Sequence, residues 1–328
     1  TYFATNDFAA IGGDGAEIGF GRCGENTPPP SANPACPGGS SATRQADNTP
    51  ADDKQGGIAI RTSLPILNEI NLGFYAANYH SRLPLISGKA ATTIGVSATA
   101  GYLIEYPENI KLYGVSFNTA TFWGMGIQGE YSYKRNQPLQ VDDVELLVAG
   151  LRAFSSQVGA YGAGEYIRGW RRHDVSQVDM SLTKILNPRF LGIDEVVLLG
   201  EVAGMHIHDL PPTSELRYEG PGTFTPGDAA LATANGVPQQ TTGFATATSY
   251  GYKLVARAKW EGLGSFNINS TLRFDHDIKG TSPTPLGNFV EERKLVQAGV
   301  EVSYLDNITM GVDWASYFGG GNFNLIND

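Results

Sequence analysis

Paired histidines and neighbouring carboxylates are the first residues in this sequence that could do chemistry. His206 and His208 lie two positions apart beside Asp209, so they would share one face of a strand and could contact a metal. The Asp-His-Asp segment at 275–277 is a second group, but calcium needs more oxygen ligands than this segment provides. Solvated positions at the rim of a sheet are the preferred interpretation of both groups, and we expect no metal and no cofactor.

Motifs typical of enzymes are missing from the sequence. It contains no Gly-x-Ser-x-Gly elbow, no Walker loop and no Cys-x-x-Cys pair. Ser81 follows His80, but two neighbours in sequence do not make a nucleophile and its base. We therefore predict no catalytic residue and no enzymatic activity.

The two cysteines, Cys23 and Cys36, lie in a stretch at 9–56 that is rich in Gly, Pro, Ser and Asn. This composition is typical of a long loop, which we expect to be extracellular. A disulfide in an oxidising compartment is the preferred interpretation of the cysteines. A metal-binding pair is the weaker one, because no nearby His or third Cys completes a site.

Composition excludes two classes of protein. The formal net charge is −10, so no basic surplus exists to bind nucleic acid. No segment approaches the roughly 20 consecutive apolar residues of a membrane-spanning helix. Charged residues make up only 17% of the chain, and 41 glycines accompany 15 tyrosines and 15 phenylalanines. Such a composition favours many strands joined by turns.

Apolar and polar residues alternate with a period of two along much of the chain after Lys54. In Trp123–Tyr133, for example, the aromatic and aliphatic side chains share one strand face and Gln128 and Glu130 the other. The alternation predicts ten strands, at 57–64, 68–79, 109–118, 123–133, 175–186, 194–207, 250–260, 266–275, 296–304 and 308–318.

Short and long connections between these strands alternate without exception. The long ones are 80–108, 134–174, 208–246 and 279–290. This predicts an all-β, antiparallel, up-and-down transmembrane β-barrel over 1–328, with short periplasmic turns and long extracellular loops. A soluble sandwich or barrel is the alternative. Long strands, aromatic residues near strand ends and charges at mid-strand favour the membrane barrel.

One long loop contains a helical pattern. Val144, Leu147, Val148, Leu151 and Phe154 recur at helical spacing behind a capping aspartate at 142 or 143, which predicts a helix at 143–154. The helix either folds over the mouth of the pore or packs against neighbouring loops, and the sequence does not choose between them.

Charged residues on the polar strand faces are the candidates for the barrel lumen. Among them, Lys253, Arg257 and Lys259 form a basic stripe that could pair with carboxylates on neighbouring strands. Such charges either stabilise the interior or form a constriction that sets selectivity. The candidates are Arg61, Glu69, Glu130, Asp179, Glu201, Lys253, Arg257, Lys259, Arg273, Asp275, Glu301 and Asp313.

Apolar residues in the long loops are the candidates for ligand capture, because they could line an apolar vestibule. Packing of one loop on another is the alternative. The candidates are Tyr79, Leu83, Leu85, Ile86, Tyr102, Tyr106, Leu147, Leu151 and Phe154.

Five stretches of the chain carry a resemblance to a known family. They are FATNDF at 3–8, YHSRLP at 79–84, YPENIKLYGVSFNT at 106–119, QGEYSY at 128–133 and PLQ at 138–140. Together they resemble a proteobacterial, pseudomonad-type outer-membrane family that is named only as a domain of unknown function. The resemblance implies further strands beyond both ends of this segment. Bacterial outer-membrane barrels usually have an even number of strands, so we expect a total of about 14 to 18. The family is also similar in style to long-chain fatty-acid transporters of the outer membrane, by analogy only.

These observations lead to an expected function in the bacterial outer membrane. We expect a channel or transporter for small hydrophobic or amphipathic molecules, with a constricted or plugged lumen. A barrel that displays long loops or anchors a surface assembly is one alternative, and a general diffusion porin is another. The expected partners are outer-membrane lipid, a hydrophobic small-molecule ligand, and periplasmic or inner-membrane transport proteins.

Overall fold

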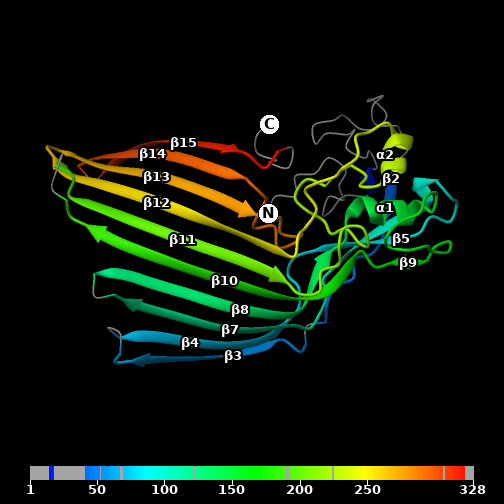
Figure 1. Ribbon diagram of the computed structural model, residues 1–328, viewed down its shortest axis with the longest axis horizontal. Coiled ribbons are helices and arrows are strands. Elements are labelled where there is room, and N and C mark those ends of the chain that lie inside the picture. Colours follow the sequence, from blue (N-terminus) through cyan, green and yellow to red (C-terminus); the bar gives the residue numbers. More distant parts are fainter. Residues whose placement is uncertain are drawn as a thin grey trace.

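The computed structural model describes residues 15–17 and 41–321, apart from 52, 67–68, 122, 189–191, 224 and 306. Within this part of the chain, the strands form one sheet of ten and a second sheet of five. Figure 1 shows the smaller sheet and the helices gathered at one end of the long strands.

All ten predicted strands are present, and they lie side by side in chain order with every neighbouring pair antiparallel. In chain order they are β3 (Gly56–Leu64), β4 (Ile70–Tyr79), β7 (Ile110–Ala120), β8 (Met125–Gln140), β10 (Trp170–Leu186), β11 (Glu195–Ile207), β12 (Thr248–Leu263), β13 (Phe266–Lys279), β14 (Lys294–Tyr304) and β15 (Ile308–Phe318). The short turns lie at the end away from the second sheet, and the long connections lie at the other end (Figure 1).

Strands β8 and β10 extend well beyond the bounds that their alternation predicts, and β12 and β13 also extend beyond theirs. β8 continues to Gln140 and β10 begins at Trp170, so the connection between them spans 141–169 rather than 134–174. The added residues pair with one another, but the register shifts between His173 and Val175. A bulge of this kind interrupts the period of two, which hides the strand ends in the sequence.

The ten-stranded sheet is open in this structure, because β3 and β15 form its two edges. The predicted antiparallel up-and-down order is therefore present, whereas closure into a barrel is not.

The second sheet is built from segments that the sequence analysis assigned to loops. Its order is β1 (Gly15–Glu17), β2 (Ser41–Arg44), β6 (Gly101–Glu105), β5 (Leu85–Lys89) and β9 (Tyr166–Ile167). β2 and β6 run parallel, and the other neighbours are antiparallel. We call this sheet, together with segments 80–109, 141–169, 208–247 and 280–293, the cap.

Short helices complete the cap: the 3₁₀ helix η1 (Ser97–Thr99), α1 (Asp143–Leu151) and α2 (Ala229–Asn235). The helix predicted at 143–154 is thus present but ends earlier, because Arg152 adopts a left-handed conformation with φ of 60°. The sequence analysis missed α2, which Asp228 caps by accepting a hydrogen bond from the Leu231 amide. Among the described residues, no helix is long and apolar enough to cross a membrane.

The hydrophobic core lies in the cap. One cluster joins the cap-side ends of β8, β10 and β11 to α1 and includes Leu139, Val175 and Ile207. A second cluster packs α1 against β2 and β6 and includes Val144 and Ile104. Between the short turns and these ends, the ten-stranded sheet instead exposes its apolar side chains, such as Val312, which is 77% exposed.

Candidate functional site

The polar face of the ten-stranded sheet brings most of the predicted lumen residues together. Cross-strand register places Glu201 opposite Lys253, and Lys253 opposite Asp275. Residues in register share a face. The ion pair between Lys253 Nζ and Glu201 Oε1 is 2.9 Å long, which matches the predicted pairing of the basic stripe with a neighbouring strand.

Two of the candidates are carboxylates that oppose each other directly. Glu130 on β8 and Asp179 on β10 are register partners. Like charges opposite each other repel, so this pair makes the middle of the polar face locally acidic. Arg61 on β3 contacts Tyr75 on the neighbouring strand β4. Its guanidinium carbon lies 5.7 Å from the centroid of the Tyr75 ring.

The other charged candidates pair mainly within one strand. Arg273 forms two hydrogen bonds with Asp275 on β13, of 2.8 and 2.5 Å. Lys259 contacts Glu261 at 2.5 Å on its own strand rather than on a neighbour. Glu301 accepts a hydrogen bond of 3.4 Å from the Asn269 amide.

Glu69 is the candidate that the structure places elsewhere. It lies in the turn between β3 and β4, with φ of 64°, and β4 begins only at Ile70. The sequence analysis started this strand at 68 and so extended the alternation into the turn. Glu69 therefore does not lie on the polar face.

Three hollows follow one another across the polar face. The largest, of about 630 Å³, is lined by Arg61, Glu130 and Asp179. A second, of about 470 Å³, is lined by Arg257, Arg273 and Asp313 among others. The third, of about 360 Å³, is lined by Asp179, Glu201 and Lys253 together with Asn288 and Phe289 of the cap. The cap thus reaches the polar side of the sheet.

Most candidates for ligand capture are packed inside the cap. Leu85 and Tyr102 are buried, and four more candidates pack against the cap clusters: Ile86, Tyr106, Leu147 and Leu151. Tyr79, at the end of β4, is half-buried. Loop packing accounts for these residues, whereas Leu83 and Phe154 are exposed and stay available for a ligand.

Gln140 fastens the cap to the sheet at the end of β8. Its side-chain oxygen accepts the Ile86 amide at 2.7 Å, and its side-chain nitrogen donates to the Ile86 and Gly169 carbonyl oxygens at 3.0 and 2.7 Å. A Cβ at Gly169 would collide with the Ile86 carbonyl oxygen, so only glycine allows this approach.

A second fastening is the buried carboxylate of Glu105 on β6. It accepts hydrogen bonds from Asn48, Tyr166 and Trp170 at 2.9, 2.6 and 2.8 Å, and a fourth from Ser87. Burial alone would raise the pKa of Glu105, but the four donors outweigh it and the pKa is lowered. The ionised carboxylate therefore holds strands of the cap sheet and the start of β10 together.

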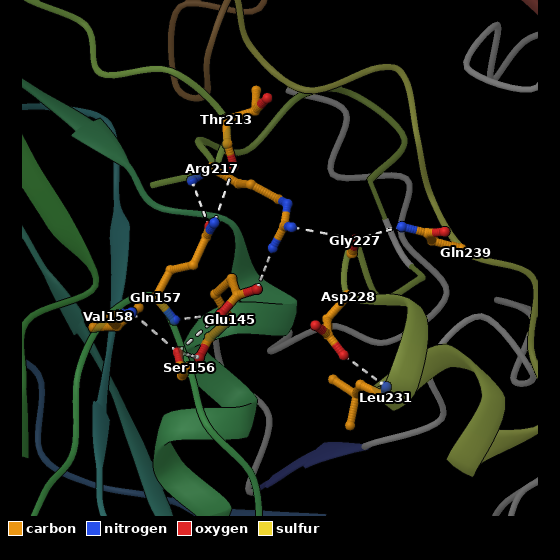
Figure 2. Close-up of polar contacts among 10 residues, drawn as sticks. All are labelled: Glu145, Ser156, Gln157, Val158, Thr213, Arg217, Gly227, Asp228, Leu231 and Gln239. Atoms are coloured by element: carbon orange, nitrogen blue, oxygen red, sulfur yellow. Dashed lines mark hydrogen bonds and ion pairs between the residues drawn. The ribbon is translucent and has the colours of Figure 1, made fainter. Parts of the chain in front are cut away.

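Arg217 links α1 to the segment before α2, as Figure 2 shows. Its guanidinium forms a 2.6 Å ion pair with Glu145 and donates to the Gly227 carbonyl oxygen at 3.2 Å. The other carboxylate oxygen of Glu145 accepts from the Ser156 hydroxyl and the Gln157 amide at 2.9 and 2.8 Å. Both charged side chains are mostly buried.

Beside this network, three further carboxylates come together: Asp142, Asp143 and Glu219. Burial is the main cause that raises the pKa of Asp142 well above its usual range, with smaller contributions from the charges of Asp143 and Glu145. Burial likewise raises the pKa of Glu219 well above its usual range, followed by the charges of Asp143 and Asp142.

The sequence analysis missed this cluster. It assigned the aspartates at 142 and 143 to helix capping, and Glu219 lies 76 residues beyond Asp143 in an unassigned loop. Only the pairing of the two segments in the fold brings the carboxylates together. The two predicted disulfide partners, Cys23 and Cys36, lie outside the described residues, so the disulfide stays a prediction.

Comparison with known proteins identifies the family of this chain. No curated protein matches the chain. The model of the family described as "Protein of unknown function (DUF1302)" matches residues 1–328. The expected membership of a family named as a domain of unknown function is thus confirmed, and the chain belongs to the DUF1302 family.

Proposed function

We propose that this chain forms the wall of a β-barrel in a bacterial outer membrane and conducts small hydrophobic or amphipathic molecules through a constricted lumen. One observation carries the proposal. The ten-stranded sheet exposes large apolar side chains on one face and presents charged side chains on the other, while its hydrophobic core lies in the cap.

The apolar face supports a lipid environment. Along its strands, large apolar side chains are exposed in a continuous band that includes Ile60, Val178, Leu254, Leu272 and Val312. A soluble monomer rarely exposes such a large apolar surface, whereas lipid acyl chains would cover it.

Aromatic side chains border this band at both ends. Trp123, Phe266 and Tyr304 are exposed near the short turns, and Tyr131 and Phe318 are exposed nearer the cap. Aromatic girdles at the two membrane interfaces have this arrangement.

A wall in lipid has no free strand edge, because unpaired backbone groups are costly there. The proposal therefore requires β3 and β15, the edges of the described sheet, to pair with each other or with further strands.

The polar face supports a narrowed path rather than a wide aqueous pore. Glu201 and Lys253 form an ion pair on this face, and Phe289 of the cap lines a hollow with them. Paired charges attract free ions weakly, and the exposed cap residues Leu83 and Phe154 suit apolar groups. These features favour hydrophobic or amphipathic cargo over general diffusion.

Conductance in a planar lipid bilayer tests this function with the purified full-length protein. The proposal predicts rare, small openings and a copurified lipid-like ligand that mass spectrometry identifies. Large, steady open steps would overturn it in favour of a general porin. A silent protein with no bound ligand and a partner docked on the loops would overturn it in favour of a structural barrel.

A further inference from the structure

A groove lies on the apolar face of the sheet, across β3, β4, β7 and β8. Its volume is about 380 Å³, and most of its lining side chains are apolar or aromatic, among them Ile58, Phe74, Ala76, Tyr113, Tyr131 and Tyr133. Cross-strand register explains the depression, because Ala76 is in register with Ile58 on one side and with Tyr113 on the other. A methyl group therefore lies between two much larger side chains, and the face is hollowed there.

Two cations lie at the cap-side end of this groove. Lys111 is the second residue of β7 and is in register with Arg135 on β8, and both side chains are exposed. Two residues further from the cap, the same two strands place Tyr113 opposite Tyr133. Side chains two residues apart share a face of a strand. Lys111 and Arg135 therefore lie on the apolar face, directly beyond the two tyrosines.

The two cations favour an anion between them, because like charges directly opposite each other on neighbouring strands repel. The carboxylate of Asp174 interacts electrostatically with Arg135, but it already accepts hydrogen bonds from the Tyr133 hydroxyl at 2.5 Å and the Asn136 amide at 3.0 Å. Neither Lys111 nor Arg135 forms an ion pair with another residue that the structure describes. This end of the groove therefore attracts a further negative group.

We propose that this groove binds one anionic membrane lipid, with an acyl chain in its apolar part and the headgroup phosphate between Lys111 and Arg135. The inference rests on the proposed function, which places this face of the sheet in a membrane. Toward the cap, apolar side chains are followed by tyrosines and then by cations. A lipid presents its acyl chain, its ester region and its phosphate in the same order. A guanidinium binds phosphate through two parallel hydrogen bonds, and an ammonium adds a point charge.

Native mass spectrometry of the purified full-length protein in detergent tests this proposal. The probe is phosphatidylglycerol, and phosphatidylcholine with the same acyl chains is its zwitterionic counterpart. Wild type is expected to bind one molecule of phosphatidylglycerol in preference to phosphatidylcholine. Lys111→Gln combined with Arg135→Gln should weaken that binding about 10- to 30-fold, because two side chains that attract an anionic lipid are removed. Both side chains are exposed and their removal relieves repulsion, so the variant should fold, which the heat-dependent gel shift checks.

Lys279→Gln combined with Lys294→Gln is the matched control for charge. These lysines lie at the cap-side ends of β13 and β14, away from the groove, so the same loss of two charges should leave lipid affinity unchanged. Ala76→Phe tests the groove itself, because it fills the depression and keeps both cations, and it should also weaken phosphatidylglycerol binding. Its control is Ala298→Phe on β14, in register with Leu272 of the apolar face, which should bind as wild type does.

Four results would overturn the proposal. Equal binding of the two lipids would remove the role of charge, and unchanged binding in either groove variant would remove the site. Displacement of the lipid by inorganic phosphate alone would indicate a phosphate site. A dimer that Ala76→Phe dissociates would indicate that a second copy of the chain occupies the groove. Conductance enters none of these results, so a protein that conducts as a general porin but binds the lipid as expected would refute the proposed transport function alone.

Discussion

Leu139 and Leu272 are both leucines in long strands of one sheet, yet Leu139 is fully buried where β8 meets the cap and Leu272 is 60% exposed. The same contrast holds for their regions. The cap buries its apolar residues in two clusters around α1, as a water-soluble fold does. The sheet turns its apolar residues outward and its charges to the other face. The comparison teaches that apolar residues are buried on one side of the cap-side ends of β8 and β10 and exposed on the other, which is what the proposed function expects of a chain with its cap in water and its sheet in lipid.

Truncation of core leucines should give the largest effect. Leu139→Ala is expected to destabilise the cap by about 2–5 kcal/mol, because it removes buried contacts and leaves a cavity. Leu254→Ala on the exposed face should cost less, since under the proposed function lipid would fill the space. Both losses of stability are measured by unfolding each variant with urea in lipid vesicles, with proteolysis of the cap as the readout. Equal losses would contradict two different environments.

Charge on the apolar face should come next. Leu272→Arg is expected to cost about 2–4 kcal/mol if the face lies in the bilayer. Its neighbour Thr271 lines a hollow on the polar face, so Thr271→Arg is the control and should be tolerated. Folding into vesicles, read from the heat-dependent gel shift, compares the two variants. If Thr271→Arg is the more damaging, the faces are assigned the wrong way round.

Acid should loosen the cap through Glu105. The pKa of Glu105 is lowered in the folded state, so its stabilisation is present above the ordinary carboxyl pKa and is lost as pH falls through the lowered value. Glu105→Gln should cost about 1.5–3 kcal/mol at pH 7, as expected for hydrogen bonds to a charged group. In Glu105→Gln, the unfolding temperature of the cap should also depend less on acid pH, which thermal melts at a series of pH values measure. Wild type and variant with the same acid dependence would refute this role.

The smallest effect on stability is expected at the partly exposed pair of Lys253 and Glu201. Lys253→Met should change the free energy of unfolding by less than about 1 kcal/mol. It leaves Glu201 unpaired on the polar face, so residual conductance should become more cation-selective, which the reversal potential in a salt gradient measures. Lys184→Met, near the short turns, is the control. An unchanged reversal potential would separate this pair from the conduction path.

The sheet was predictable from the sequence because its period of two is regular and its turns are short. All ten strands and their antiparallel order follow from that pattern. The cap-side ends of β8 and β10 could not be predicted in this way, because the register shift near His173 interrupts the alternation. Glu69 was assigned to a strand because nothing in the period of two marks where a turn ends and a strand begins.

The cap was largely unpredictable because its contacts join distant segments. β2 pairs with β6 across more than fifty residues, and both strands are too short to show a period. Of the cap's helices, only α1 has an apolar stripe long enough to be recognised. The cluster of Asp142, Asp143 and Glu219 depends on the bridge between Val141 and Tyr218, which no local pattern encodes.

The orientation of β14 in lipid tests the central claim most directly. Single cysteines at residues 296–302, in a protein with Ser at positions 23 and 36, would carry nitroxide labels in lipid vesicles. Collision with oxygen, which concentrates in lipid, should peak at 296, 298, 300 and 302. Collision with a water-soluble nickel chelate should peak at 297, 299 and 301, the side of Gln297 and Glu301. The reverse pattern, or equal access at all seven positions, would contradict a sheet that stands with its apolar face in the membrane.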